Sequence, residues 1–482
     1  MSSAEVKAAP SAPFACIGPG AYSPASGCLP SKEINMTRLA IRVAVAVLAF
    51  GATRVASAQG PVDSALVAYI ASIRAIDNHA HPMRPVQAGA PADSEFDALP
   101  LDGIPPFPLP WRLRLENPEW RTAQSALFGI PNNGSDDAFR ATLHARRAQE
   151  LRARRDGYPA WVLDRAGIDV MLANRIAVGQ GLQPPRFRWV AFADALMLPL
   201  DTRGEGARSP DTRSLYAKEQ VLLRRYLRDL NVVRLPATLD EYVSRVVRPT
   251  LERQQHNGAI AVKFEAAYLR PLDFADAAAA EARRVYSRYA ARGTPTRAEY
   301  KALEDYLFKE IAREAGRLGM AVHIHVLDTF GGFYSARGSA PHQLESTFND
   351  STLRGTTFVM IHGGWPLFAQ TESMLSKPNV YTDISMMVLV AEPRELANTL
   401  RSWLTAWPEK VLFGTDAFDG GADQGWEEVA WLGASTARRA LALALTGMMR
   451  DGEIDRPRAE ALARMVLREN AAKLYGTSVA SR

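Results

Sequence analysis

The chain has 482 residues, 47% of them hydrophobic and 23% charged, which is an ordinary composition for a soluble globular protein. Its net charge is +5, but five basic and only two acidic residues fall within the first 58 positions. Without that segment the charge is too small to attract a polyanion strongly, so we expect no nucleic-acid binding. The length suffices for one large α/β domain or two smaller ones.

The first 58 residues have the features of a targeting segment. A short basic stretch begins at Met36, an apolar run covers residues 43–52, and small residues at 56–58 form a cleavage signal before Gln59. The apolar run is too short to span a bilayer, so we expect no stable membrane anchor. Residues 1–35 are rich in Pro, Gly, Ser and Ala, and we expect a disordered extension upstream of the true start of translation. These features predict an exported protein, periplasmic or secreted.

Both cysteines, Cys16 and Cys28, precede the predicted signal peptide at residues 36–58. The mature chain, residues 59–482, would then contain no cysteine. This excludes a disulfide framework, a thiol nucleophile and cysteine metal ligands from the folded domain.

The mature chain opens with a helical apolar pattern over residues 61–74 and then a strand, Ala75-Ile-Asp-Asn-His-Ala-His-Pro82. The proline-rich residues 83–111 predict an extended loop, because proline suits neither a helix interior nor a central strand. Ser135 or Asp136 is expected to cap a basic helix that runs to about residue 155. Its arginines are expected to form a solvated face.

Beyond residue 157, strands and helices alternate. Further strands are expected at residues 167–173, 187–197, 259–264, 320–326, 357–362, 380–383 and 410–416. Helices are expected at residues 161–166, 239–255, 298–318, 341–349, 367–376, 394–407, 426–450 and 457–474, with a polar excursion at 271–296. Eight strands, most of them followed by a helix, predict a parallel sheet. They fit a single (β/α)8 TIM barrel with a loop and helix insertion after the first strand and extra C-terminal helices.

The first strand ends in two histidines, His79 and His81. In an extended backbone residues i and i+2 point to the same face, so both imidazoles can reach one point. Neutral imidazole is a common metal ligand, which makes this pair half of a candidate metal site. A plain hydrogen-bonded pair is the alternative.

Polar residues also stand at the ends of later strands. They are Lys263, His323, His325, His362 and Asp416. The C-terminal strand ends of a closed barrel meet at one mouth, where the active site lies, whereas a doubly wound open sheet usually binds its ligand at one switch point. The spread of these residues therefore favours the barrel and a shared metal site. Individually, Lys263 could pair with Glu265 or Asp416, His362 could be a core histidine, and Asp416 could cap a helix.

Several motifs resemble those of the amidohydrolase superfamily, in its amidohydrolase-related branch. They are Asp77-Asn-His-Ala-His-Pro82, Lys263, Val322-His-Ile-His325, Ile361-His-Gly-Gly-Trp365, Phe413-Gly-Thr-Asp416 and the closing helix Val466–Tyr475. The resemblance implies two divalent cations, usually zinc. His79, His81 and Asp416 would hold one, and His325 and His362 the other. A carbamylated Lys263 would bridge them.

The resemblance also implies a metal-dependent hydrolase. A metal-activated hydroxide would attack an amide, lactam, lactone or ester carbonyl, with Asp416 as general base and then acid. His325 is the preferred ligand on its strand, and His323 would then support the ligands or contact the substrate.

A metal-dependent decarboxylase of small aromatic acids, with one metal and an unmodified Lys263, is the alternative enzyme. A metal-free barrel serving as a binding protein is the alternative outside catalysis. We expect a small-molecule substrate, and a homo-oligomer is compatible with the sequence. Candidates for substrate contact by position are Trp111, Tyr268, Arg270, Phe330, Tyr334, Trp365 and Asp419.

Overall fold

The computed structural model describes residues 61–86, 89–101, 106–327 and 334–476. The predicted extension and signal peptide lie outside the described residues, as does Phe330. The unit that begins at Val62 carries the fold. Among the helices of this described part, none is both long and apolar enough to cross a membrane.

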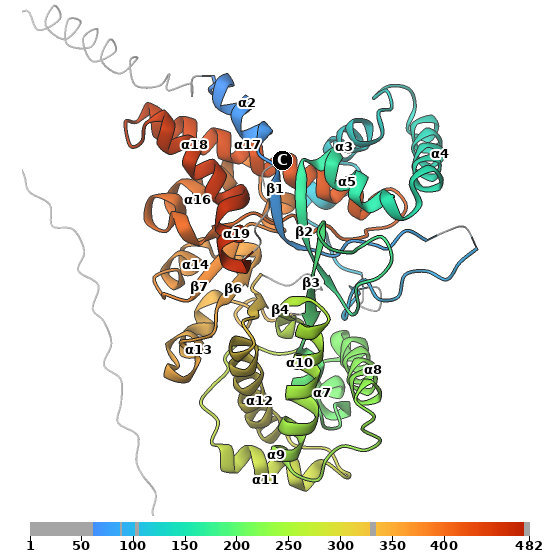
Figure 1. The fold of residues 1–482 in the computed structure, drawn as a ribbon, viewed down its shortest axis with the longest axis vertical. Helices are drawn as coiled ribbons and strands as arrows, with labels where there is room; N and C mark the ends of the chain where they lie inside the picture. Colours follow the sequence, from blue (N-terminus) through green and yellow to red (C-terminus); the bar gives the residue numbers. More distant parts are fainter. Residues whose placement is uncertain (1–60, 87–88, 102–105, 328–333, 477–482) are drawn as a thin grey trace, which may run out of the picture. The chain divides into compact units, whose positions relative to one another are not determined.

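Eight parallel strands form the centre of the domain (Figure 1). They are β1 (Ala75–Ala80), β2 (Ile168–Arg175), β3 (Phe187–Phe192), β4 (Ala259–Phe264), β5 (Ala321–His325), β6 (Phe358–Ile361), β7 (Val380–Asp383) and β8 (Val411–Leu412). Each strand pairs in parallel with the next one along the chain. The sheet order therefore follows the sequence from β1 to β8, as a (β/α)8 barrel requires.

Backbone hydrogen bonds join the two ends of the sheet. Asn78 N donates to Phe413 O at 2.8 Å, Asp416 N to His79 O at 2.8 Å, and His81 N to Ala417 O at 2.7 Å. The segment after β8 thus lies along β1 and closes the barrel beside the two predicted histidines. This confirms the predicted TIM barrel.

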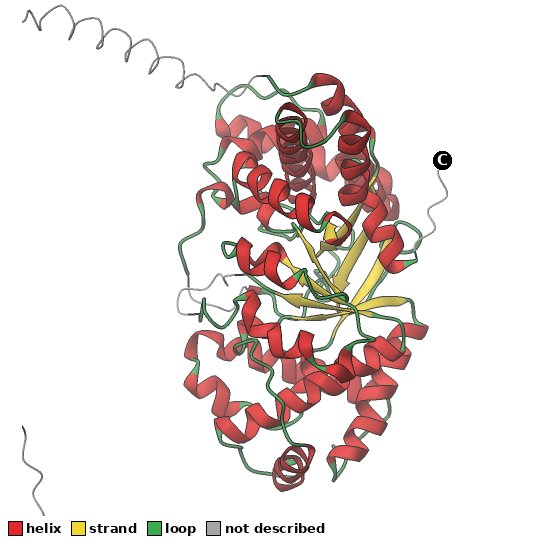
Figure 2. Ribbon diagram, turned by 90° about the vertical axis from the view of Figure 1, so that its left-hand side faces the viewer, coloured by secondary structure: helices red, strands yellow, loops and turns green. Residues whose placement is uncertain are grey.

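Helices enclose the strands (Figure 2). The helix α2 (Ser64–Ser72) precedes the first strand. The insertion between β1 and β2 contains α3 (Pro118–Phe128), α4 (Asp136–Arg154) and α5 (Tyr158–Ala166). The connection between β3 and β4 contains α6 (Asp194–Met197), α7 (Arg203–Arg208), α8 (Arg213–Asp229), α9 (Leu239–Tyr242) and α10 (Arg248–His256). The later ones are α11 (Ala279–Tyr289), α12 (Arg297–Arg317), α13 (Glu345–Asn349), α14 (Phe368–Met374), α15 (Met387–Val390), α16 (Pro393–Ala406), α17 (Trp426–Arg450), α18 (Arg456–Arg464) and α19 (Asn470–Tyr475).

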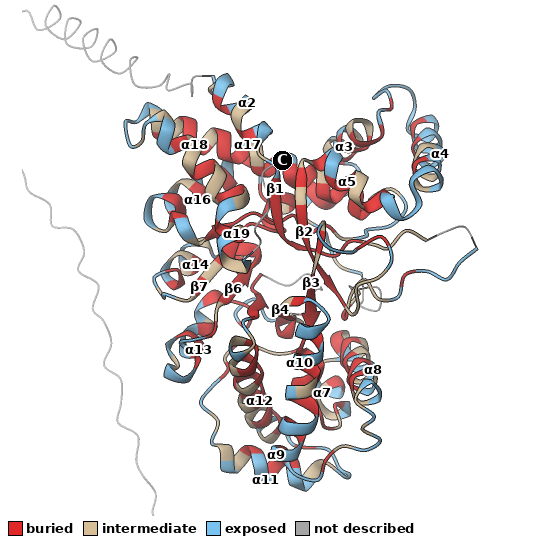
Figure 3. Ribbon diagram, in the orientation of Figure 1, coloured by how far each residue is buried: buried red, intermediate tan, exposed pale blue. Residues whose placement is uncertain are grey.

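Burial follows this layering: the strands are buried, and the exposed residues gather on the outward faces of the helices (Figure 3). Apolar side chains from seven of the eight strands form one cluster, which includes Ile76, Val190 and Ile361. Ala471 of α19 belongs to the same cluster. The C-terminal helix therefore packs against the barrel strands.

Several stretches differ from the sequence prediction: the helices α3 and α8 were not predicted, and the strand expected at 410–416 is only Val411–Leu412. Two further differences have a clear cause. The strand expected at 187–197 ends at Phe192, and its second half is the short helix α6, because a buried apolar run has no periodicity that separates strand from helix. The polar excursion at 271–296 contains α11, which buries only Ala282, Val285 and Tyr286. So narrow an apolar stripe is a weak sequence signal.

The basic helix of the insertion matches its prediction. It starts at Asp136 because the Ser135 side chain accepts a hydrogen bond from Ala138 N, which makes Ser135 the N-cap. Arg146 and Arg154 both contact Glu150, which suits a solvated helix face. Arg147 departs from this prediction, because it is half-buried and pairs with the buried Glu428.

Candidate metal centre

The site is built where β1 meets the end of β8. Asp77 anchors this junction, because its carboxylate accepts hydrogen bonds from Thr415 N at 2.9 Å and from Thr415 Oγ1 at 2.5 Å. Burial raises the pKa of Asp77 to about 7, although these hydrogen bonds oppose the shift. The bonds hold Asp416 against His79.

His79, His81 and Asp416 come together as predicted. The distance from His79 Nε2 to Asp416 Oδ1 is 3.0 Å, from His79 Nε2 to His81 Nε2 3.3 Å, and from His81 Nε2 to Asp416 Oδ1 3.6 Å. Two ligands that each lie about 2.1 Å from a tetrahedral ion are about 3.4 Å apart. The three atoms are therefore spaced like the ligands of one divalent cation.

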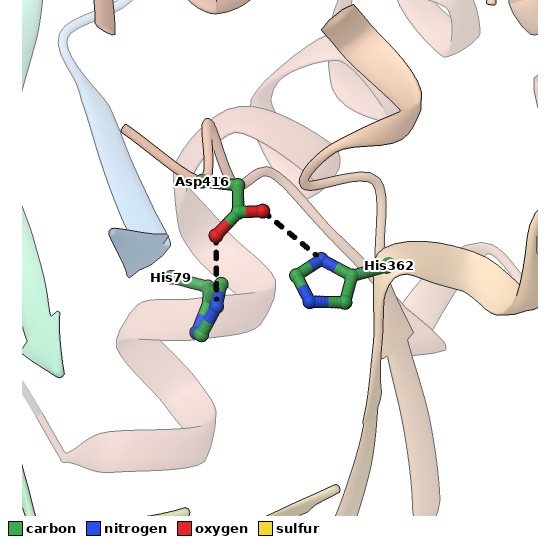
Figure 4. A group of neighbouring side chains, drawn as sticks. All are labelled: His79, His362 and Asp416. Carbon is green, nitrogen blue, oxygen red and sulfur yellow. Dashed lines mark ion pairs between the residues drawn. The ribbon is translucent and has the colours of Figure 1, made fainter. Parts of the chain in front are cut away.

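His362 and His325 form the neighbouring group. His362 Nε2 lies 3.1 Å from His325 Nδ1, and His362 Nδ1 lies 3.7 Å from Asp416 Oδ2. Figure 4 shows Asp416 with one carboxylate oxygen facing His79 and the other facing His362. His79, His362 and Asp416 each offer a ligand atom within 4.8 Å of the others. Asp416 thus connects the two predicted ligand sets.

Two of these residues have positive φ angles, 72° for His362 and 55° for Asp416. Residues other than glycine rarely adopt a positive φ, and backbone strain of this kind concentrates at functional sites. Gly363 follows His362 with a φ of 60°, and a Cβ there would lie 2.2 Å from Met387 Sδ. Only glycine fits this turn, which directs the His362 ring into the site.

Lys263 lies between the ligand groups and is fully buried. Its Nζ is 3.4 Å from His79 Nε2 and 3.8 Å from Glu265 Oε1. Both distances permit weak contacts only, and no other side chain of the described residues is within salt-bridge distance of this amine. The amine is thus close enough to the metal ligands to take part in the site.

Burial lowers the pKa of all five histidines, and the positive charge of Lys263 adds to the effect. The pKa falls to about 4 for His81 and to about 3 for His323. The rings are therefore neutral at pH 7, which is the form that binds metal.

Burial raises the pKa of Asp416 to about 8, and Lys263 opposes this shift. A carboxyl group in such a position ionises readily only when more positive charge is close by. Four neutral imidazoles around a buried carboxyl group of this kind form a donor set that fits a divalent cation.

Comparison with known proteins agrees with this donor set. The family model described as Amidohydrolase matches residues 229–477, slightly more than half of the chain. The chain belongs to the amidohydrolase family. No curated protein sequence matches this amidohydrolase.

Solved structures share its fold at low sequence identity. A metal-dependent hydrolase from Lactobacillus casei is 15% identical with a TM-score of 0.53, over 85% of this chain and 97% of that one. The uronate isomerase of Thermotoga maritima is 14% identical with a TM-score of 0.56, over 75% and 79% of the two chains. The glucuronate isomerase of Caulobacter crescentus is 15% identical with a TM-score of 0.56, over 86% and 94%. At this identity the likeness establishes the barrel fold of the amidohydrolase alone.

The sequence prediction missed Asp383, at the end of β7. Its carboxylate accepts hydrogen bonds from Ser385 Oγ at 2.6 Å, from His362 N at 2.8 Å and from Asn78 Nδ2 at 2.8 Å. Ser385 Oγ in turn lies 3.0 Å from His362 Nδ1. Asp383 therefore fixes the backbone and the ring of His362. The sequence feature that could have indicated Asp383 is an acidic residue at the end of a predicted strand.

His323 forms a hydrogen bond with a residue outside the ligand cluster. Its Nε2 lies 2.8 Å from the Tyr475 hydroxyl of α19, and that hydroxyl donates to Asn78 Oδ1 at 2.5 Å. The Tyr475 proton is used on Asn78, so His323 Nε2 must be the donor in the other bond. This nitrogen then has no lone pair for a metal. His325 Nδ1, in contrast, lies 3.1 Å from His362 Nε2, which supports His325 as the ligand of β5.

Replacing Tyr475 with phenylalanine is expected to lower the free energy of unfolding by about 1–3 kcal/mol, because it leaves buried groups of His323 and Asn78 without a partner. Urea unfolding of Tyr475→Phe measures this. Tyr381→Phe is the matched control, because the Tyr381 side chain lies at the half-buried edge of β7 over Lys410. Equal stability of the two variants would contradict the structural role of the Tyr475 hydroxyl.

Not all of the residues predicted to contact the substrate lie free beside the metal centre. Arg270 is bound by Glu304 at 2.9 Å and by Asp305 at 2.6 Å, and its guanidinium stacks over Phe274. A substrate carboxylate would have to displace these partners, so the structure does not favour Arg270 as a substrate contact. The two acids lie on α12, beyond the reach of local sequence patterns.

Aromatic residues are closer to the site. The Tyr268 ring lies 4.5 Å from the His325 ring, and the Tyr334 ring 5.8 Å from Tyr268. Trp365 is half-buried against the apolar cluster of the β7–β8 side, whereas Trp111 and Asp419 are exposed. Tyr268 and Tyr334 are thus the predicted residues best placed to line a substrate path.

Proposed function

We propose that this amidohydrolase hydrolyses an amide, lactam, lactone or ester of a small molecule at a divalent-cation centre. The observation that carries the proposal is the cluster of four neutral imidazoles and Asp416, in which neighbouring nitrogen and oxygen atoms lie 3.0–3.7 Å apart. Divalent cations bound there would lower the pKa of a water molecule and polarise the scissile carbonyl.

The finer proposal is a pair of zinc ions. His79, His81 and Asp416 would hold one ion, and His325 and His362 the other. Lys263 would contribute a carbamate, formed when its neutral Nζ attacks the carbon of CO2 and loses a proton. Support comes from the position of Nζ, which is fully buried and lies 3.4 Å from His79 Nε2.

Side chains of the protein would then have separate roles in the reaction. Asp416 has one oxygen toward each ligand set, so it can accept a proton from the attacking water and return it to the leaving group. Asp383 and Ser385 would keep the His362 ring in place during this transfer. Tyr268 and Tyr334 would shield one side of the site from bulk water.

We also propose export to the periplasm or the exterior, followed by action on a small-molecule substrate without a membrane anchor or nucleic-acid partner. The sequence features at residues 36–58 and the small charge of the mature chain support this. A homo-oligomer is compatible with it.

A specific observation favours the decarboxylase alternative. Glu265 Oε1 lies 3.8 Å from Lys263 Nζ, a weak contact that would be an ion pair if Lys263 is an ammonium and not a carbamate. A charged Lys263 would leave room for only one cation, held by the β1 histidines and Asp416.

Elemental analysis together with a substrate screen tests both proposals. The zinc-loaded protein is expected to contain two equivalents of metal and to hydrolyse members of a panel of dipeptides, lactones and esters. Activity should disappear after dialysis against a chelator and return with zinc or manganese. One equivalent of metal with decarboxylation of aromatic acids would favour the alternative enzyme. A protein that takes up no metal would contradict both proposals and favour a binding protein.

A further inference from the structure

Asp97 belongs to the insertion between β1 and α3, and it reaches the metal centre from outside the barrel. Its Oδ2 lies 3.4 Å from His81 Nδ1, on the side of the ring opposite to the Nε2 that faces His79 and Asp416. His81 Nδ1 is buried and makes no well-aligned hydrogen bond within the described part of the chain, and the backbone of Phe96 lies near the same ring. The carboxylate of Asp97 therefore lies beside Nδ1, the nitrogen of His81 that faces away from His79 and Asp416.

The loop that carries Asp97 is held rigidly. Asp93 forms a buried two-pronged ion pair with Arg175 at the end of β2, with distances of 2.8 and 2.9 Å. Two residues further on, Glu95 pairs with Arg225 of α8 at 2.6 Å. Buried two-pronged pairs fix position as well as charge. The segment 93–97 is thus anchored to β2 and α8 on its way to the metal centre.

The carboxylate itself is oriented by its own loop. Asp97 Oδ1 accepts a hydrogen bond from Leu99 N at 3.1 Å, which leaves Oδ2 to face His81. The side chain keeps 17% of its surface exposed. Asp97 therefore presents a fixed carboxylate oxygen to His81 Nδ1.

A metal-binding imidazole needs the lone pair of one nitrogen, and the proton then resides on the other. That second N–H usually donates to a carboxylate or carbonyl, which fixes both the tautomer and the ring orientation. His79 Nε2, His81 Nε2 and Asp416 Oδ1 have ligand spacing, so the proton of His81 belongs on Nδ1, where Asp97 lies.

We propose that Asp97 is a positioning residue of the metal centre: it accepts the Nδ1 proton of His81 and holds the Nε2 lone pair toward the cation. This inference rests on the proposed function in requiring a cation at His79, His81 and Asp416. It goes further because it assigns a role in the site to the insertion.

Metal affinity of two variants tests the assignment. Asp97→Ala is expected to bind zinc about 10–100-fold more weakly than the wild type, with Asp97→Asn in between because its amide oxygen remains a weak acceptor. The number of zinc ions bound at saturation should not change, since Asp97 is not itself a ligand. Competition with a chromophoric chelator gives the affinity, and elemental analysis gives the number.

Glu116→Gln is the matched control, because it removes an exposed carboxylate from the same insertion, outside the anchored segment 93–97 and away from His81. It is expected to retain the wild-type affinity. Nitrogen-15 NMR of histidine-labelled, zinc-loaded protein provides a readout that loop stability would not move. The wild type should show His81 protonated on Nδ1 and slow to exchange with solvent, and Asp97→Ala should show faster exchange of that proton.

The outcomes separate the two proposals. If the wild type binds zinc and hydrolyses substrate but Asp97→Ala has the same affinity and the same proton exchange, Asp97 has no positioning role and the proposed function stands. Loss of a whole equivalent of zinc in Asp97→Ala would make Asp97 a direct ligand, together with Glu265 and His81, which lie within 4.8 Å of it. This too would overturn the assignment. A wild type that binds no cation would overturn both proposals.

Discussion

Replacing Asp416 with asparagine is expected to lower kcat by about two to four orders of magnitude, which is the range that a positioned proton acceptor contributes. The amide has nearly the shape of the carboxylate, but it cannot take up a proton at neutral pH. The fold should survive the change. Asp416 has a φ of 55°, and asparagine is among the few residues that tolerate this conformation. Its backbone N–H still donates to His79 O.

The measurement is kcat at saturating zinc, with the bound metal quantified in the same samples, because an amide is a weaker ligand than a carboxylate. Asp423→Asn is the control. Asp423 lies in the same connection between β8 and α17 but pairs with His144 at the surface. We expect that variant to keep its activity. An Asp416→Asn protein with wild-type kcat would exclude Asp416 as the proton acceptor.

Much of the fold could be predicted because barrel strands have a strong local signal. Most are short buried apolar runs with a polar residue at or just beyond the C-terminal end. The strand at 259–264 shows this, since Ala259–Val262 are apolar and Lys263 comes near the end. Because parallel strand ends meet at one mouth, placing the strands also placed the candidate ligands. The histidines and Asp416 lie together for this reason.

The residues that support the ligands could not be predicted in the same way. Tyr475 reaches His323 across 152 positions of sequence, and Asp93 reaches Arg175 across 82. Such contacts depend on how α19 and the insertion pack, which no local pattern encodes. Arg270 shows that position alone can also mislead. Its place after β4 suggested a substrate contact, but its guanidinium pairs with Glu304 and Asp305 of α12.

Removing the amine of Lys263 is expected to have the second large effect. In the proposed site the carbamate supplies the oxygens shared by two cations, so Lys263→Ala should bind one equivalent of zinc in place of two. Its kcat should fall by about two orders of magnitude or more, because the loss of one cation removes part of the charge that would activate water and polarise the carbonyl. Elemental analysis and kcat measure these effects.

Addition of a short carboxylic acid makes this test specific. The alanine variant leaves a cavity beside His79 that propionate can enter, so propionate should restore part of the second equivalent of zinc and part of the activity. Propionate is expected to leave the wild type unchanged, and labelled bicarbonate should yield a carbamate carbon signal in the wild type alone.

An ammonium paired with Glu265 predicts the opposite pattern. Lys263→Ala would then leave the buried Glu265 carboxylate without its partner, at a cost of about 3–5 kcal/mol in unfolding free energy. Adding Glu265→Gln would recover most of that loss, and metal content would remain at one equivalent throughout. A stability defect that Glu265→Gln repairs, with no response to propionate, would contradict the two-cation site and identify the single-cation centre of the alternative enzyme.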